Sequence, residues 1–230
     1  RAPVLAAISP HSVNEGSQLQ FVVTATDPDG GTLALMAEFI PLNATFADSS
    51  NGHGLFTFNP NFTQTGSYNV RFIVSDGSLP DTEIAIITVT EFNRPPVLAA
   101  IGPQTVNENQ QLRFVVTSTD PDGGILMLSV QDAPLNATFA DSGNGHGLFS
   151  FTPDFTQAGS YNVRFIVSDG ALTDSELVTI TVNNVNRNPV LAAIGPRNVN
   201  ENQLLQFVVT SSDPDGGTLT LTAQHLPLNA

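Results

Sequence analysis

Gly66-Ser-Tyr-Asn-Val-Arg-Phe-Ile-Val-Ser-Asp-Gly77 returns unchanged as Gly159–Gly170, 93 residues further along the chain. In the first copy the core-type side chains take every second position, at Tyr68, Val70, Phe72 and Val74. That spacing is typical of one face of a β-strand. The stretch ends in Ser-Asp-Gly, which favours a tight turn. It therefore predicts a half-buried strand that runs into a turn, once in each copy.

This stretch belongs to a repeat that runs through the whole chain. Arg1-Ala-Pro-Val-Leu-Ala-Ala-Ile8 recurs with small changes at Arg94 and again at Arg187, without an insertion or deletion between copies. A period of 93 residues is the size of a domain, whereas solenoid units have roughly 20 to 50 residues. The sequence predicts two complete domains, 1–93 and 94–186, and a partial third copy, 187–230, with only the first three strands.

The same period-two pattern predicts the other strands of a complete copy. In the first copy we expect strands at 4–8, 18–26, 32–39, 44–47, 55–58, 68–74 and 85–89. Seven short strands without a helical pattern indicate an all-β fold, a two-sheet antiparallel sandwich of immunoglobulin or cadherin type, arranged as beads on a string. Tyr68 and Tyr161 stand where a tyrosine corner forms. We assign four phenylalanines to the core, Phe56, Phe58, Phe62 and Phe72.

The partial third copy cannot close a sandwich by itself. Three strands leave an apolar face and open sheet edges. Three explanations stay open: the chain is a window from a longer array, strands of another chain complete the copy, or the remainder is disordered.

The composition excludes several functions. The chain has 21 acidic residues against 7 basic ones, a formal charge of −14, and every basic residue is arginine. Nucleic acid is not expected as a partner, because the arginines are spread singly. Without cysteine or lysine there is no disulfide, thiolate zinc site, cysteine nucleophile or Lys–Asn isopeptide bond. No apolar stretch is long enough for a membrane span. No Gly-x-Ser-x-Gly motif of a serine nucleophile occurs either, and we expect no enzyme.

Four acidic positions recur in each copy, and they have two interpretations. They are Glu15, Asp27, Asp29 and Asp76, then Glu108, Asp120, Asp122 and Asp169, then Glu201, Asp213 and Asp215. Asp-Pro-Asp-Gly and Ser-Asp-Gly are good turn sequences in their own right. Asp-x-Asp in a turn also brings two carboxylates together, and Ca²⁺ takes six to eight oxygen ligands.

Taken together, these residues resemble the cadherin-like repeats of large extracellular proteins, including bacterial surface proteins and dystroglycan-type variants. The resemblance rests on Val13-Asn-Glu15, Thr26-Asp-Pro-Asp29, Val74-Ser-Asp76 and the boundary pattern Asn-x-x-Pro-Val. The segments Pro41–Ala44, Phe58–Pro60 and Gly66–Tyr68 resemble bacterial immunoglobulin-like repeats in addition. The resemblance covers essentially the whole chain.

The cadherin resemblance implies Ca²⁺ at the junctions between repeats. Glu15 would act together with Asp120 and Asp122, and Glu108 together with Asp213 and Asp215. The late-strand ligand of the family is matched by Asp76 and Asp169.

Two departures from the family pattern leave a second possibility open. The linkers carry Asn93-Arg94 and Asn186-Arg187, with arginine where the family has a ligand aspartate. The acidic Leu-Asp-Arg-Glu element of cadherins is also replaced, by Phe62-Thr-Gln64 and Phe155-Thr-Gln157. Either Ca²⁺ binds the remaining carboxylates, or the Arg94 and Arg187 guanidinium groups bridge Glu and Asp in its place.

Three Asn-x-Thr tripeptides have the form of glycosylation sites, at Asn43, Asn61 and Asn136. The sequence as a whole predicts a non-enzymatic, extracellular and bacterial structural or adhesive rod whose partners are neighbouring repeats and other copies in a filament. The alternatives are an adhesin module that binds a surface glycan or protein, and a fibre subunit completed by strand exchange.

Overall fold

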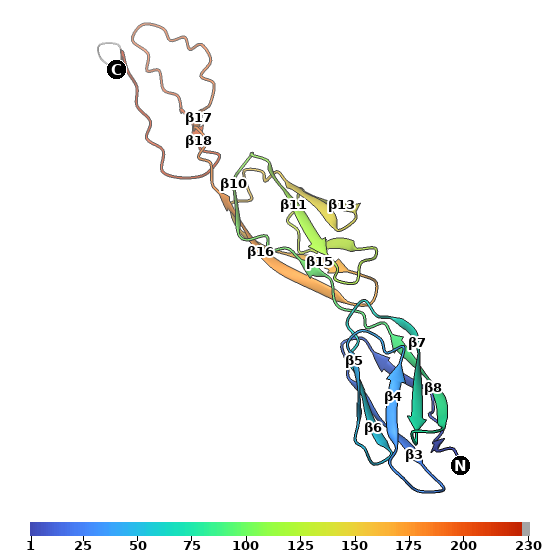
Figure 1. Ribbon diagram of the computed structural model, residues 1–230. Helices are drawn as coiled ribbons and strands as arrows, with labels where there is room; N and C mark the ends of the chain where they lie inside the picture. The colour runs from blue at the N-terminus through green and yellow to red at the C-terminus, as the bar shows by residue number, and fades with distance from the viewer. Residues whose placement is uncertain (227–230) are drawn as a thin grey trace. The chain divides into compact units, whose positions relative to one another are not determined.

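The computed structural model describes residues 1–226 and contains only β-strands and loops in that range (Figure 1). Two compact units are present. The first comprises residues 1–95 together with the turn Asp120–Gly124, and the second comprises 96–119 and the chain from 125 onward. Four residues of the predicted third copy, 227–230, lie outside the described residues.

Eight strands form the first unit. They are β1 (Val4–Leu5), β2 (His11–Asn14), β3 (Leu19–Thr26), β4 (Ala34–Glu38), β5 (Ala44–Asp48), β6 (His53–Phe58), β7 (Gly66–Ser75) and β8 (Pro80–Thr90). They make two four-stranded sheets, with the orders β1-β3-β6-β5 and β2-β8-β7-β4. The predicted all-β sandwich is thereby confirmed.

The second unit repeats this arrangement strand by strand. Its strands are β9 (Val97–Leu98), β10 (Gln104–Asn107), β11 (Leu112–Thr119), β12 (Met127–Gln131), β13 (Ala137–Gly143), β14 (His146–Phe151), β15 (Gly159–Ser168) and β16 (Thr173–Asn183). The sheets have the orders β9-β11-β14-β13 and β10-β16-β15-β12.

The prediction of seven antiparallel strands is wrong at the start of each copy. The strand predicted at 4–8 is only β1, and an additional strand, β2, follows Pro10, which has no backbone N–H and interrupts the ladder. β1 pairs antiparallel with β3, whereas β2 crosses to the other sheet and pairs parallel with β8. β2 therefore ties the start of the repeat to its last strand.

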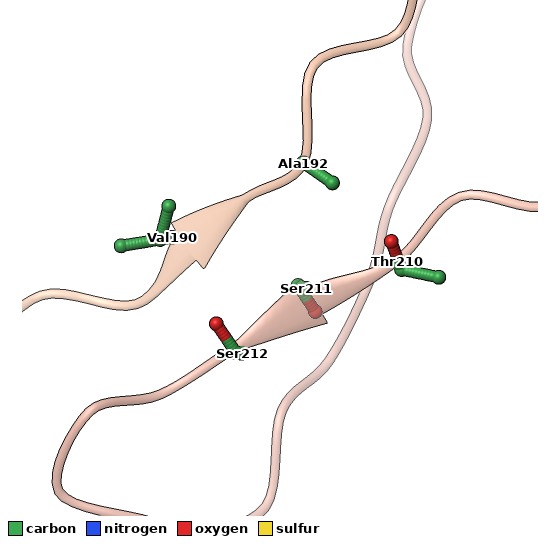
Figure 2. Close-up of a pocket in the computed structure, with 5 residues that line it drawn as sticks. All are labelled: Val190, Ala192, Thr210, Ser211 and Ser212. Carbon is green, nitrogen blue, oxygen red and sulfur yellow. The ribbon is translucent and has the colours of Figure 1, made fainter.

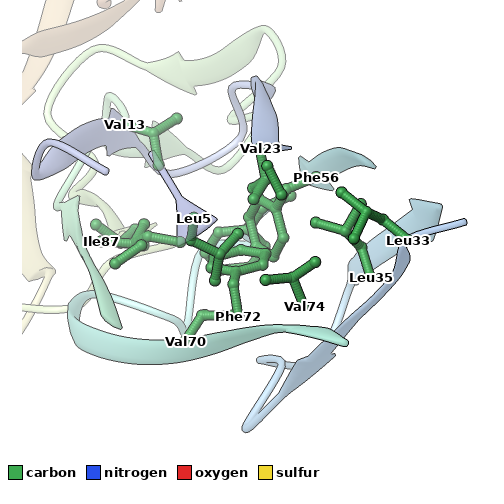
Figure 3. Close-up of a cluster of buried hydrophobic side chains, with 14 residues drawn as sticks. Leu5, Val13, Val23, Leu33, Leu35, Phe56, Val70, Phe72, Val74 and Ile87 are labelled. Carbon is green, nitrogen blue, oxygen red and sulfur yellow. The ribbon is translucent and has the colours of Figure 1, made fainter. Parts of the chain in front are cut away.

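The core of the first unit is built from the inward faces of both sheets, as Figure 3 shows. Phe56, Phe58 and Phe72 are fully buried, which confirms three of the four core assignments. Phe72 lies at the centre, with ring centroids 5.2 Å from Phe46, 5.8 Å from Phe56 and 5.9 Å from Phe21. Such edge-to-face contacts add to the free energy gained by burying apolar surface.

The predicted tyrosine corner is confirmed in both units. Tyr68 Oη donates a hydrogen bond to the Gln64 carbonyl oxygen at 2.8 Å. Tyr161 Oη donates in the same way to Gln157 at 2.9 Å. Each bond fixes the loop that precedes the long strand β7 or β15.

The third copy does not form the three strands that its sequence predicts. Within 187–226 only β17 (Val190–Leu191) and β18 (Ser211–Ser212) pair, in the register of β1 and β3. Figure 2 shows this pair, together with Ala192 and Thr210, around a shallow depression without a charged lining residue. Residues 187–226 contain no counterpart of β6, β7 and β8 for these side chains to pack against, so Phe207 stays 43% exposed.

Candidate functional site

The first linker arginine is held by an aromatic ring and a carboxylate of the first unit. Arg94 Nε and Nη2 donate hydrogen bonds to Asp122 Oδ1 at 2.8 and 2.5 Å, and its backbone N–H donates to Oδ2 at 2.6 Å. Nη2 also donates to the Pro121 carbonyl oxygen at 2.8 Å. The guanidinium carbon lies 4.2 Å from the centroid of the Phe62 ring. We call Phe62, Arg94 and Asp122 the first clasp.

The same arrangement recurs one period later, within the second unit. Arg187 Nε donates to Asp215 Oδ1 at 2.8 Å, its backbone N–H donates to Oδ2, and Nη2 donates to the Pro214 carbonyl oxygen at 2.8 Å. Its guanidinium carbon lies 4.6 Å from the centroid of the Phe155 ring. Phe155, Arg187 and Asp215 form the second clasp.

Local structure places each member of the first clasp. Asp120 Oδ1 accepts the Asp122 N–H at 2.7 Å, an Asx turn that fixes the Asp122 backbone. Phe62 stands in the loop between β6 and β7, and its ring lies over Gly16. A Cβ at position 16 would lie only 2.8 Å from the ring, and the backbone there has a φ of +69°, so glycine fits both demands.

The two aspartates of the clasps are largely shielded from water. The Asp122 and Asp215 side chains are each 8% exposed, against 29% and 31% for the arginines. Hydrogen bonds from Arg187 lower the pKa of Asp215 below its ordinary value. The guanidinium donors converge on one carboxylate oxygen while the backbone N–H of the same arginine binds the other. A shielded pair of this kind, stacked on an aromatic ring, is stronger than an open surface ion pair.

The glutamates Glu15 and Glu108, at matching positions of the two repeats, accept hydrogen bonds from backbone N–H groups. Glu15 is 4% exposed, and its Oε1 accepts the Gln64 N–H at 3.1 Å, the Thr65 N–H at 2.9 Å and the Thr65 hydroxyl at 2.7 Å. Phe92 also donates its backbone N–H to this carboxylate. Glu108 accepts from the Ala158 N–H at 3.1 Å and from the Val185 N–H at 2.8 Å. Each glutamate therefore joins a loop to the end of the last strand.

The remaining predicted acidic residues form turns. Asp76 Oδ1 accepts the Ser78 and Leu79 N–H groups at 2.7 and 2.8 Å, and Asp169 Oδ1 accepts those of Ala171 and Leu172 at 2.7 and 2.6 Å. Asp27 and Asp213 accept the N–H two residues later, at 2.8 and 2.9 Å, like Asp120. The turn interpretation is confirmed for these aspartates. Glu201 is exposed in the incomplete third copy.

In the described part of the chain, the predicted acidic positions do not fit Ca²⁺. Within residues 1–226 no three His, Asp or Glu residues come together in a group that could hold a metal ion. The carboxylate of Asp122 is bound to an arginine, and that of Glu15 to N–H donors. Asp120 Oδ2 is the one buried carboxylate oxygen of the described residues that has no hydrogen-bond partner. A single unpartnered oxygen does not fit a cation that needs six to eight.

The glycosylation-type asparagines are parts of the protein's own hydrogen-bond network. Asn43 Nδ2 donates to Gln64 Oε1 at 2.8 Å, and Asn136 Nδ2 donates to Gln157 Oε1 at 2.9 Å. Asn61 Oδ1 accepts from the Thr63 N–H and hydroxyl at 3.0 and 2.8 Å. The linker residues Asn93 and Asn186 lie beside the clasp arginines in the sequence, and Asn186 Nδ2 makes a long contact of 3.5 Å to the Arg187 carbonyl oxygen.

Sequence reasoning missed two features of the site. Phe62, assigned to the core, is 40% exposed and serves as the platform for Arg94. Gln64, buried to 8% exposure, links the Asn43 turn to the Glu15 loop. A signal was present for the first, because the aromatic residue and the arginine depart from the cadherin pattern together.

We expect the first unit to lose stability in acid. Hydrogen bonds, the largest from the Thr65 hydroxyl, lower the pKa of Glu15 from its ordinary 4.5. Backbone N–H groups of Leu79 and Ser78 lower the pKa of Asp76 from 3.8. Since the folded state then binds fewer protons, this stability is present above about pH 4.5 and is lost as the pH falls through the folded pKa values.

The measurement is the calorimetric melting temperature of the first unit between pH 7 and pH 3. Thr65→Ala copies the second repeat, which has Ala158, and removes the largest cause of the Glu15 shift. This variant should lose less on acidification than the wild type. An equal loss in both would contradict the assignment.

A family model described as bacterial Ig domain matches residues 1–90 and 93–181. The chain belongs to the bacterial Ig domain family. The two matches agree with the repeat period, and each covers one sandwich of the structure. The cadherin-like and bacterial immunoglobulin-like resemblance expected from the sequence is confirmed.

Relatives of this bacterial Ig domain chain include much longer proteins. Integrin beta-like protein A of Dictyostelium discoideum is 25% identical over 70% of the chain, which spans 10% of that protein. Protocadherin Fat 4 of Mus musculus is 28% identical over 68%, spanning 4%. Chitinase A of Pseudoalteromonas piscicida is 30% identical over 56%, spanning 16%. The chain thus spans a small fraction of each of these relatives.

A solved structure with the same fold is the extracellular domain of protocadherin GammaB4. It matches 94% of this chain and 38% of its own length, with a TM-score of 0.53 and 20% sequence identity. That likeness shows the fold alone. Across residues 1–226, no helix has the length and apolar character that crossing a membrane demands.

Proposed function

We propose that this bacterial Ig domain chain is a segment of a non-enzymatic, extracellular adhesive rod, and that the clasps limit bending at its linkers. The observation that carries the proposal is the recurrence of the same Phe–Arg–Asp arrangement after each complete repeat. Arg94 is the first residue after the first 93-residue period, so its contacts fix the linker backbone. Proline at positions 95 and 96 restricts that backbone further.

The clasp provides at the linker what a bound cation provides in cadherin-like repeats. A guanidinium group is a permanent cation with a planar set of donors that matches both oxygens of a carboxylate. Phe62 stands where cadherins have an acidic element, and its ring face attracts the arginine. In our proposal the two departures from the cadherin pattern, the linker arginine and the phenylalanine, act together in one clasp. Calcium binding at the linkers stays a prediction of the cadherin resemblance, and a calcium titration of the chain tests it.

The proposal is tested by replacing the clasp arginine. Arg94→Gln removes the ion pair and the stacked cation, so we expect a wider spread of conformations in small-angle X-ray scattering. We also expect a fall of about 5 °C in the melting temperature of the first unit. High salt should weaken the wild-type clasp only in part, because Asp122 is shielded.

Arg113→Gln serves as the matched control, since Arg113 is an exposed arginine on β11 outside the clasps. It should leave both the scattering profile and the melting temperature unchanged. If Arg94→Gln scatters like the wild type at every salt concentration, the clasp does not stiffen the linker.

A further inference from the structure

The outward face of the sheet β2-β8-β7-β4 differs between the two complete repeats. In the first repeat this face is apolar, with Met36 51%, Ile84 57% and Ile86 44% exposed. These residues lie on neighbouring strands of the same sheet, since β4 pairs with β7 and β7 with β8 (Figure 1). Across the strands Met36 is opposite Ile73, and Arg71 lies between Glu38 and Ile84. We call this set, with Phe39, the β4–β7–β8 face.

The second repeat makes the same face less apolar, although Leu177 takes the position of Ile84 and Met127 that of Ala34, with exposed fractions of 52% and 58%. Met36, Phe39 and Ile86 correspond to Ser129, Asp132 and Thr179 at the matching positions, 93 residues later. Phe46, Phe56 and Phe72, which form the core, correspond to Phe139, Phe149 and Phe165 without change. The sandwich therefore does not need apolar side chains at positions 36, 39 and 86, because the second unit folds in the same topology with polar residues there.

Phe39 costs conformational energy that packing within the repeat does not offset. Its φ is +57°, and its side chain is 73% exposed. The second repeat has the same turn, with Asp132 at φ +57°, and aspartate adopts this left-handed region more readily than phenylalanine. The ring stands beside Arg71, whose guanidinium carbon is 5.7 Å from the ring centroid. A strained and exposed aromatic residue points to a role outside the domain.

The charged residues on this face, Arg71 and Glu38, favour a second copy of the chain as the partner. Arg71 and Glu38 form an ion pair, so the face is neutral on a chain whose formal charge is −14. A second copy can dock about a two-fold axis that lies in the interface plane and crosses the line from Glu38 to Arg71 at right angles at its midpoint. In that arrangement each Arg71 lies opposite the Glu38 of the other copy. Association there buries no net charge, on a chain whose overall charge of −14 makes its copies repel one another. The aliphatic side chains and the flexible Met36 also suit a protein surface better than a glycan.

We propose that the β4–β7–β8 face of the first repeat is a self-association surface, through which two copies of this chain pair face to face. The surface is separate from the clasps, so the proposal does not depend on the proposed function. It rests on three side chains, Met36, Phe39 and Ile86, which the second repeat replaces with polar ones.

Sedimentation velocity of the full chain over a concentration series tests the proposal. The wild type should show a monomer–dimer equilibrium. The triple variant Met36→Ser, Phe39→Asp and Ile86→Thr carries the residues of the second repeat, so it should fold normally. Its self-association should be weaker by about tenfold or more. Val22→Thr, on the other sheet and 57% exposed, should dimerise like the wild type.

A charge exchange sharpens the test. Glu38→Arg should weaken the dimer, and adding Arg71→Glu to it should restore self-association, because the face is then again complementary to itself. A wild type that stays monomeric at its highest soluble concentration overturns the proposal, even if a glycan or another protein binds this face. A triple variant that dimerises like the wild type overturns it as well.

Discussion

Phe72→Ala should unfold the first unit well below the melting temperature of the wild type. Phe72 is fully buried and contacts three aromatic rings at centroid distances of 5.2 to 5.9 Å. Truncation of such a residue removes its burial and leaves a cavity, at a cost of about 3–5 kcal/mol. For a domain of this size the melting temperature should fall by roughly 15 °C or more.

The repeat supplies an internal comparison for this prediction. Phe165→Ala makes the equivalent change in the second unit, where Phe165 is also fully buried. Differential scanning calorimetry should show that each variant lowers one transition and leaves the other near its wild-type temperature. Val22→Ala, at a 57% exposed position on β3 outside the β4–β7–β8 face, should lower neither to a comparable extent. If Phe72→Ala lowered both transitions equally, the two units would not have separate cores.

The second large effect is expected for Glu15→Ala. This variant leaves the N–H groups of Gln64, Thr65 and Phe92 without their acceptor at a buried position. Unsatisfied buried donors destabilise the folded state. The loop that carries Phe62 and the end of β8 would both be released. We expect the melting temperature of the first unit to fall by about 10 °C or more.

Glu15→Gln separates hydrogen bonding from charge. Glutamine keeps one acceptor oxygen and the same size, so it should destabilise the first unit less than alanine does. It should also remove part of the acid sensitivity, because the group no longer titrates. If neither Glu15→Ala nor Glu15→Gln changed the melting temperature, Glu15 would not hold the loop. The interpretation of this residue as a metal ligand would then be favoured.

Most of the sandwich could be predicted from the sequence, because its strands alternate with a clear period of two. Tyr68 and the three buried phenylalanines lay where expected. The short strand β2 was missed, although Pro10 marks where the chain leaves β1. The parallel pairing of β2 with β8 depends on a contact between residues 76 positions apart, as in His11 with Ile87. Periodicity does not contain such long-range information.

The acidic positions were harder to interpret, since one residue type serves several purposes. Asp-Pro-Asp-Gly forms a turn, but the turn also presents Asp122 to Arg94. Glu15 stands where the cadherin resemblance implies a calcium ligand, yet backbone N–H groups bind its carboxylate. Neither local pattern indicates which group binds each carboxylate. Thr65 binds Glu15 from 50 residues away, and Arg94, stacked on Phe62, binds Asp122 from 28 residues away, so these contacts exist only in the fold.

In our proposal arginine takes the place of calcium at the linkers, and this can be tested by melting the chain with and without calcium. The full chain is stripped with a chelator and then melted in chelator, in excess Ca²⁺, and in Mg²⁺ at the same ionic strength. We predict melting temperatures within about 1 °C of one another, because the carboxylates that would bind the ion are already occupied. A rise of several degrees in Ca²⁺ alone would contradict the account.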